Sequence, residues 1–335
     1  MYMKGNDLNK KWIVDRVNES FNFYYGVLGK DEKIIYEKFC YAYLNLSDSV
    51  LVDSTDIKSI GRIFKMTLID NPVFFYVNTI TYYCYSDYTD CHITYLDSID
   101  AINESINVID KALKGLSKEC EGRSDLEKEV IIHNTIVGQV DYQLDDTHLI
   151  HKSNSIFLNQ KAVCDGISLG AKMLLDHVGV KTIVVKDHFG KEREGESGHA
   201  WNMVFVNKGF YHIDFTFDNN LSKPRKNVSY DYFNLTDKQI SRDHDISCMF
   251  LKSSDKIADY HSMKGLTFKN QSELFRHIES CINKNTPNIY FRCIYKLLDE
   301  INVDIIKRLI RKSGYSGKYI IHLNDEQGVY DIVLD

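Results

Sequence analysis

An apolar helix followed by a two-stranded hairpin constrains this chain more than any other feature. Apolar residues at three- and four-residue steps predict a helix that begins at Cys164 and ends before Gly179. Those residues are Ile167, Leu169, Ala171, Leu174, Leu175 and Val178. The stretches 199–205 and 211–216 then predict two antiparallel strands.

Three side chains with complementary chemistry occur on these elements. Cys164 opens the helix, His199 begins the first strand and Asp214 is expected within the second strand. A helix N-terminus carries partial positive charge and free N–H groups, and both favour a thiolate, as does a neighbouring imidazolium. A thiol with a base and an orienting carboxylate is typical of acyl transfer through a thioester.

The length of the turn decides whether the histidine and the aspartate share a face. A two-residue loop at Asn207-Lys208 would pair Thr216 with His199 and place Asp214 diagonally beside His199, about 7–8 Å away at Cα. A turn at Lys208-Gly209 keeps that face but moves Asp214 one step further. A three-residue loop would turn Asp214 to the opposite face. The triad hypothesis therefore predicts a turn of even length.

Three ordered motifs resemble the transglutaminase-like superfamily, in particular its bacterial cysteine peptidases. The motifs are residues 161–166, 198–204 and 211–218, with weaker matches at 127–134, 140–142, 231–237 and 241–244. The similar part covers residues 126–245. The resemblance implies a papain-like α+β core, in which the cysteine helix packs on an antiparallel sheet. It also implies triad roles for Cys164, His199 and Asp214.

The resemblance leaves the oxyanion hole and the acyl pocket open. The chain departs from common family residues at Asn154, Gln160, Ile167 and Phe217. The backbone N–H of Cys164 is one expected oxyanion donor, and Gln160 or Asn154 is the candidate for the second. Trp201 and Tyr211 are the nearest aromatic candidates for shaping the pocket, with a packing role as the alternative for each.

These residues predict a cysteine-dependent enzyme that acts on peptide or side-chain amides, foremost a peptidase or amidase with a peptide or protein substrate. A protein transglutaminase with an amine acceptor, or a deamidase, is the first alternative. Arylamine acyl transfer uses the same triad. An alternative of another class is an inactive transglutaminase-like module that only binds. Hydrolysis or transamidation through the thioester requires no metal or organic cofactor, whereas arylamine acyl transfer would take its acyl group from a coenzyme thioester.

Length and composition indicate the number of cores and disfavour binding of nucleic acid and insertion into a membrane. The chain has 335 residues, 44% of them hydrophobic, and a net charge of −6. This length predicts more than one core, and the mild acidity disfavours general binding of nucleic acid. No apolar run reaches about 18 residues, so no membrane span is expected. The N-terminus lacks an apolar signal region. A complete chain would be cytoplasmic, and a chain that has lost a signal peptide would be secreted or bound to the cell surface.

The spacing of the cysteines in the sequence predicts free thiols and no metal site. The eight cysteines contain no Cys-x-x-Cys pair, and the histidines near Cys164 match no ligand spacing. We therefore expect no metal.

The chain is expected to divide at residues 1–123, 124–249 and 250–335. The first part should be mainly helical, with strands at 73–77, 79–85 and 92–96 and a helix over 99–116. Ser124 and Glu127 form a capping box at the start of the second part. The third part should be a small α/β unit with helices at 272–282 and 301–313 and strands at 288–294, 317–323 and 329–334.

A charged, glycine-rich stretch at 186–198 leads into His199. A solvated loop is one interpretation of it, and a mobile flap that gates Cys164 is the other.

Overall fold

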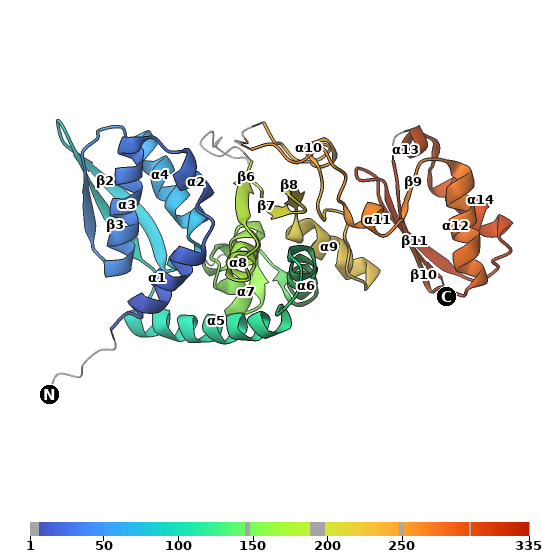
Figure 1. Ribbon diagram of the computed structural model, residues 1–335, viewed down its shortest axis with the longest axis horizontal. Coiled ribbons are helices and arrows are strands. Elements are labelled where there is room, and N and C mark those ends of the chain that lie inside the picture. The colour runs from blue at the N-terminus through green and yellow to red at the C-terminus, as the bar shows by residue number, and fades with distance from the viewer. Residues whose placement is uncertain are drawn as a thin grey trace.

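The computed structural model describes residues 7–144, 148–187, 198–247, 249, 251–294 and 296–334. An N-terminal, a central and a C-terminal part follow one another along the longest axis of the molecule (Figure 1). Each part combines helices with its own sheet, so the fold class is α+β, as the sequence predicts. Within the described ranges, no helix combines the length and apolar character needed to cross a bilayer.

The N-terminal part packs four helices beside a three-stranded antiparallel sheet. The helices are α1 (Lys10–Glu19), α2 (Phe23–Val27), α3 (Lys30–Asn45) and α4 (Ile57–Asp70). The strands are β1 (Ser49–Val52), β2 (Val77–Cys84) and β3 (Thr89–Tyr95), in the order β1-β3-β2. The long helix α5 (Ile99–Glu119) lies along both the N-terminal and the central part (Figure 1).

The strand expected at 73–77 is wrong. The 3₁₀ turn η1 (Pro72–Phe74) and a further turn at 75–76 occupy that stretch, and β2 begins only at its end, with Val77. The ring of Pro72 fixes φ and favours the first position of a helical turn, which outweighs the strand propensity of the aromatic residues. Helix α5 also continues through Gly115 and past the expected end at Leu116 to Glu119.

The central part is built around α8 (Cys164–His177) and the antiparallel sheet of β6 (Thr182–Lys186), β7 (Ala200–Val206) and β8 (Gly209–Ile213). Helix α6 (Asp125–Gln139) begins with the predicted capping box of Ser124 and Glu127. The remaining elements are β4 (Asp141–Tyr142), η2 (His148–His151), α7 (Ser155–Leu158), β5 (Lys161–Ala162), α9 (Phe215–Arg225) and α10 (Asp237–Ile240).

Helix α8 ends as the sequence predicts, with Gly179 at a φ of +86°, and joins the central part to the N-terminal part. Its buried Lys172 donates to the Asp176 carboxylate at 2.6 Å and to the Phe21 carbonyl oxygen at 3.0 Å. One hydrophobic cluster extends from α1 to β8 and includes Ile167 and Leu175. The cysteine helix therefore lies in the core that the N-terminal and central parts share.

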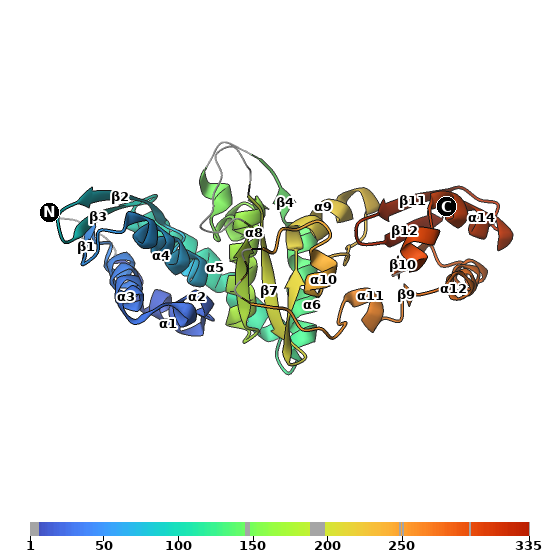
Figure 2. The same cartoon turned by 90° about the horizontal axis from the view of Figure 1, so that it is seen from above.

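The C-terminal part has a separate hydrophobic cluster. Its sheet has the order β11-β12-β10-β9, and α12 and α14 pack on each other beside that sheet (Figure 2). The strands are β9 (Thr267–Phe268), β10 (Asn288–Cys293), β11 (Tyr319–Asn324) and β12 (Val329–Leu334). The helices are α11 (Tyr260–Met263), α12 (Gln271–Asn283), α13 (Lys296–Glu300) and α14 (Val303–Lys312). The division at residues 123 and 249 stays a prediction.

Buried polar groups join the C-terminal part to the central part. The Arg225 guanidinium pairs with both carboxylate oxygens of Asp231, at 2.7 and 3.0 Å. Tyr290 and Asn324, from the C-terminal sheet, donate to the same carboxylate at 2.5 and 3.0 Å. Since Asp231 and Arg225 are 0% and 4% exposed, these bonds replace the water that both charges lose.

Removal of this carboxylate should strongly destabilise the protein. Asp231→Ala leaves the Arg225 charge buried without its partner, and we expect the free energy of unfolding to fall by roughly 3–5 kcal/mol. Urea denaturation measures the change. Asp53→Ala is the matched control, because it breaks the exposed Lys38–Asp53 pair and should leave the midpoint unchanged within error. Equal midpoints for both variants would contradict a stabilising junction.

Candidate active site

The hairpin that carries His199 has the predicted two-residue turn. Val206 pairs with Gly209, and the φ angles of Asn207 and Lys208 are +50° and +67°. Positive φ at both central residues defines a type I′ turn, whose twist matches that of the flanking strands. The prediction of an even-length turn at Asn207-Lys208 is confirmed.

Asp214 does not lie in a strand, so the expected second strand over 211–216 is wrong in its last part. Strand β8 ends at Ile213, and Asp214 is the N-cap of α9. Its Oδ1 accepts the backbone N–H groups of Thr216 and Phe217 at 2.8 and 3.0 Å. Aspartate is a preferred N-cap residue, and this local bond outweighs the alternating pattern. The expected pairing of Thr216 with His199 therefore does not form.

The other oxygen of Asp214 faces His199. Nε2 of His199 donates to Oδ2 of Asp214 at 2.6 Å, and the carboxylate is completely buried. Burial opposes ionisation of Asp214, but the two histidines bonded to it, His199 foremost, hold its pKa well below the usual range. Burial also disfavours the charged form of His199, yet the Asp214 carboxylate and the Cys164 sulfur together raise the pKa of His199 to about 10. The imidazolium form of His199 is therefore stabilised here.

Cys164 reaches this imidazole from the start of α8. The thiol is partly exposed and interacts with the His199 ring. Ser168, one turn further along, donates to the Ala200 carbonyl oxygen at 3.0 Å, directly after His199. On the opposite side, a Cβ on Gly166 would lie 2.3 Å from the Ile150 carbonyl oxygen, so only glycine allows this close packing. Contacts on both sides thus hold the first turn of α8 against the hairpin.

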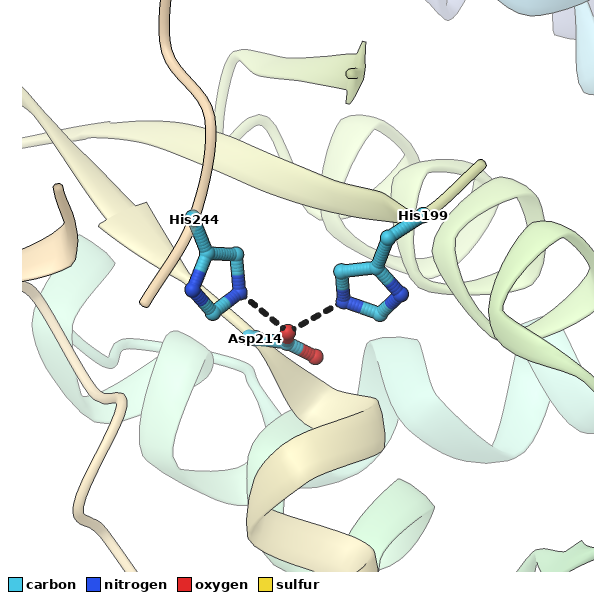
Figure 3. A group of neighbouring side chains, drawn as sticks. All are labelled: His199, Asp214 and His244. Carbon is cyan, nitrogen blue, oxygen red and sulfur yellow. Dashed lines mark hydrogen bonds and ion pairs between the residues drawn. The ribbon is translucent and has the colours of Figure 1, made fainter. Parts of the chain in front are cut away.

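A second histidine on Asp214 was missed by the sequence analysis. Nε2 of His244 also donates to Oδ2 of Asp214, at 2.9 Å, so the carboxylate lies between two imidazole rings (Figure 3). The other ring nitrogen, Nδ1, bonds to Oδ1 of Asp243 at 2.6 Å. The stretch 241–244 was recognised as similar to the family, but no role followed from it. The sequence around His244 offers one indication of a role, the adjacent pair Asp243-His244. The contact between His244 and Asp214 spans 30 residues and has no local pattern.

Two histidines and a carboxylate are also a composition that binds divalent metals. The ligand atoms of His199, Asp214 and His244 lie within 4.8 Å of one another. Bonds of about 2.05 Å to a tetrahedral zinc would separate neighbouring ligand atoms by about 3.3 Å. The observed N···O distances of 2.6 and 2.9 Å are shorter and fit hydrogen bonds. We therefore describe the three residues as a hydrogen-bonded cluster.

The remaining candidate residues occupy different environments. Trp201 is buried, stacks on His199 with ring centroids 5.9 Å apart, and donates to His212 at 3.0 Å. Tyr211 is buried in the shared core. Asn154 is buried, and its side-chain oxygen has no hydrogen-bond partner among the described residues. Gln160 is exposed and has a φ of +53°.

A pocket of about 290 Å³ lies between α4, η1 and the first turns of α8, and Cys164 is not among its lining residues. Its apolar walls include Leu68, Phe75 and Leu169. Asp165, the residue after Cys164, lines it and pairs with Lys186 at 2.7 Å. The N-terminal part thus supplies one wall of a cavity at the start of α8. Most of the expected flap, residues 188–197, lies outside the described residues.

Comparisons with known proteins add little to what these residues indicate about function. No family model and no curated protein matches the chain. One similar solved structure is that of a TGase, at 15% identity over 42% of this chain and 44% of that chain, with a TM-score of 0.29. Another is that of a proposed cysteine protease from Cytophaga hutchinsonii, at 12% identity over 41% of this chain and 61% of that chain, with a TM-score of 0.27. The chain spans less than two thirds of either, and such scores are too low to establish a shared fold.

The capping role of Asp214 can be separated from its contact with the histidines. Both Asp214→Ser and Asp214→Ala remove the acceptor of His199, but only serine can still cap α9. Asp214→Ser should therefore be about 1 kcal/mol more stable than Asp214→Ala in urea denaturation. Identical stabilities would contradict the cap.

Proposed function

We propose that this protein is a cysteine-dependent acyl-transfer enzyme with Cys164 as nucleophile, His199 as acid and base, and Asp214 as the carboxylate that orients the imidazole. The observation that carries the proposal is the position of His199, which bonds to a buried carboxylate on one side and contacts a helix-terminal thiol on the other. Because Asp214 occupies Nε2, Nδ1 is the nitrogen left to exchange protons with the thiol and the substrate.

The proposed reaction begins with a thiolate–imidazolium pair. The Cys164 sulfur attacks the carbonyl carbon of an amide, and the carbonyl oxygen becomes an oxyanion. The backbone N–H of Cys164 belongs to the first turn of α8, where N–H groups lack an intrahelical acceptor, and it is our candidate for one oxyanion donor. His199 then protonates the leaving amine as the C–N bond breaks. The product is a Cys164 thioester and a neutral His199.

The thioester is resolved by a second nucleophile. His199 takes a proton from water, the water oxygen attacks the thioester carbonyl, and the C–S bond breaks to release an acid and restore the thiolate. A primary amine in place of water would give transamidation. Partial exposure of Cys164 favours water, because transamidation needs a site that excludes it. We therefore place peptidase or amidase activity first, and transglutaminase or deamidase activity second.

Substitution of the thiol tests the proposed reaction. Wild-type protein incubated with a peptide library, with and without a primary amine, should give new peptide termini, glutamine converted to glutamate, or amine adducts in mass spectra. Cys164→Ala should lower the rate by at least about 10³-fold, and Asp214→Asn by a smaller factor through misorientation of the imidazole. Wild-type turnover in folded Cys164→Ala protein would contradict the assignment of Cys164 as the nucleophile. Lack of any product, with an unreactive thiol, would favour the binding-module alternative.

The pocket lined by Asp165, the residue after Cys164, predicts a preference for apolar substrate side chains. Leu68→Trp should partly fill this pocket and raise KM about tenfold for substrates with bulky apolar residues near the scissile amide. Substrates with small residues there should be nearly unaffected. Ile57→Trp is the matched control, since Ile57 is an exposed residue of the same helix that does not line this pocket. Equal effects of both variants would remove the pocket from the substrate site.

A further inference from the structure

His244 is hydrogen-bonded to a carboxylate at each of its ring nitrogens. Nε2 lies 2.9 Å from Asp214 and Nδ1 lies 2.6 Å from Asp243. An ionised carboxylate can only accept a hydrogen bond, and a neutral imidazole has a single N–H group to donate. Both bonds form together only when the ring carries two protons. The geometry therefore requires an imidazolium at His244.

The surroundings hold this cation in place. His244 is 8% exposed, and the rings of Phe217, Trp201 and Tyr232 lie 4.7, 5.0 and 5.6 Å from its own. Oδ2 of Asp243 accepts the Tyr232 hydroxyl at 2.6 Å, which fixes the carboxylate. The C-terminal part adds a second donor to Oδ2, the side-chain amide of Gln327, at 3.2 Å.

The titratable groups around His244 include one other cation, the protonated form of His199. They are Asp214, Asp243, His199, His212 and Tyr232. His212 accepts the indole N–H of Trp201 at Nδ1 and bonds to Asp237 at Nε2, so it is a neutral ring with one proton. Burial accordingly lowers the pKa of His212. Burial disfavours the charge on His244, but the carboxylates of Asp214 and Asp243 raise its pKa.

We propose that His244 is a positioning residue whose permanent positive charge limits how strongly Asp214 holds the proton of His199. Both rings bond to the same oxygen, Oδ2 of Asp214, so two positive charges would face each other within 4.8 Å whenever His199 is protonated. Their repulsion favours the neutral form of His199. This inference rests on the proposed function, which gives that neutral form its task.

Hydrolysis of the thioester is the step that needs the neutral ring. His199 loses its proton to the leaving amine, and the thiolate that stabilised the imidazolium is then consumed in the thioester. The charge on His244 keeps His199 from recovering a proton from solvent before water attacks. Without the charge on His244, Asp214 would hold the proton of His199 up to a higher pH. His199 could then not act as the general base in the pH range where it stays protonated.

Nitrogen NMR of histidine-labelled protein reads both charges without a substrate. The parent is Cys164→Ala, which mimics the absence of the thiolate, and the rings are assigned by substitution. His244 should show two protonated ring nitrogens through pH ~6–8, well above the unperturbed midpoint near about 6.5. In His244→Gln, which keeps one donor but no charge, the titration midpoint of His199 should rise by at least about one pH unit.

A second variant tests the effect of the His244 charge independently, and a control variant tests the effect of removing a neutral ring. Asp243→Asn removes the anion that stabilises the His244 charge, so it should also raise the His199 midpoint. His212→Gln removes a neutral neighbour and should leave that midpoint unchanged within about 0.3 units. A singly protonated His244 in the parent, or an unmoved His199 midpoint in folded His244→Gln and Asp243→Asn, overturns the proposal.

Turnover separates this proposal from the proposed function. If His244 acts as stated, the acidic limb of kcat shifts to higher pH in His244→Gln, whereas a purely structural role would lower kcat without a shift. Cysteine-dependent turnover with an unmoved limb would overturn the role of His244 alone. Turnover that survives Cys164→Ala would overturn the proposed function, and with it the catalytic role given to His244, whatever charge the NMR spectra report.

Discussion

The site depends on one buried carboxylate, that of Asp214. Burial of a charge is expensive unless hydrogen bonds replace its water, and Asp214 has four donors. Two are backbone N–H groups that begin α9, and two are the imidazoles of His199 and His244. The same side chain therefore ends strand β8, starts α9 and sets the charge of both histidines.

The parts of the chain outside the hairpin hold this arrangement from two sides. On one side, α8 is buried between the central sheet and the N-terminal part, where Lys172 bonds to the Phe21 carbonyl oxygen. On the other side, the C-terminal part reaches the cluster through Gln327 and Asp243. The flanking parts thus act on the site through its packing and its electrostatics, and the N-terminal part also forms a wall of the pocket at the start of α8.

The sequence predicted what depends on near neighbours. The α8 helix, its glycine end and the capping box at Ser124 follow from local residue spacing. The even length of the turn followed instead from the requirement that His199 and Asp214 share a face. Asp214 was misplaced because its capping bonds compete with a strand pattern of the same residues. His244 could not be assigned, because its contacts with Asp214 exist only after the chain has folded back over 30 residues. The strand at 73–77 failed for a local reason, the conformational restriction at Pro72.

The most direct test of the account is the selectivity of thiol alkylation near pH ~6, below the unperturbed thiol pKa of about 8.5. Limiting iodoacetamide is followed by peptide mass spectrometry, with Cys84, which is exposed at the end of β2, as an internal reference for access alone. The account predicts that Cys164 is labelled much faster than Cys84, and that His199→Ala abolishes this advantage. Labelling of Cys164 no faster than Cys84, or an advantage that survives in His199→Ala, would contradict an activated thiolate paired with His199.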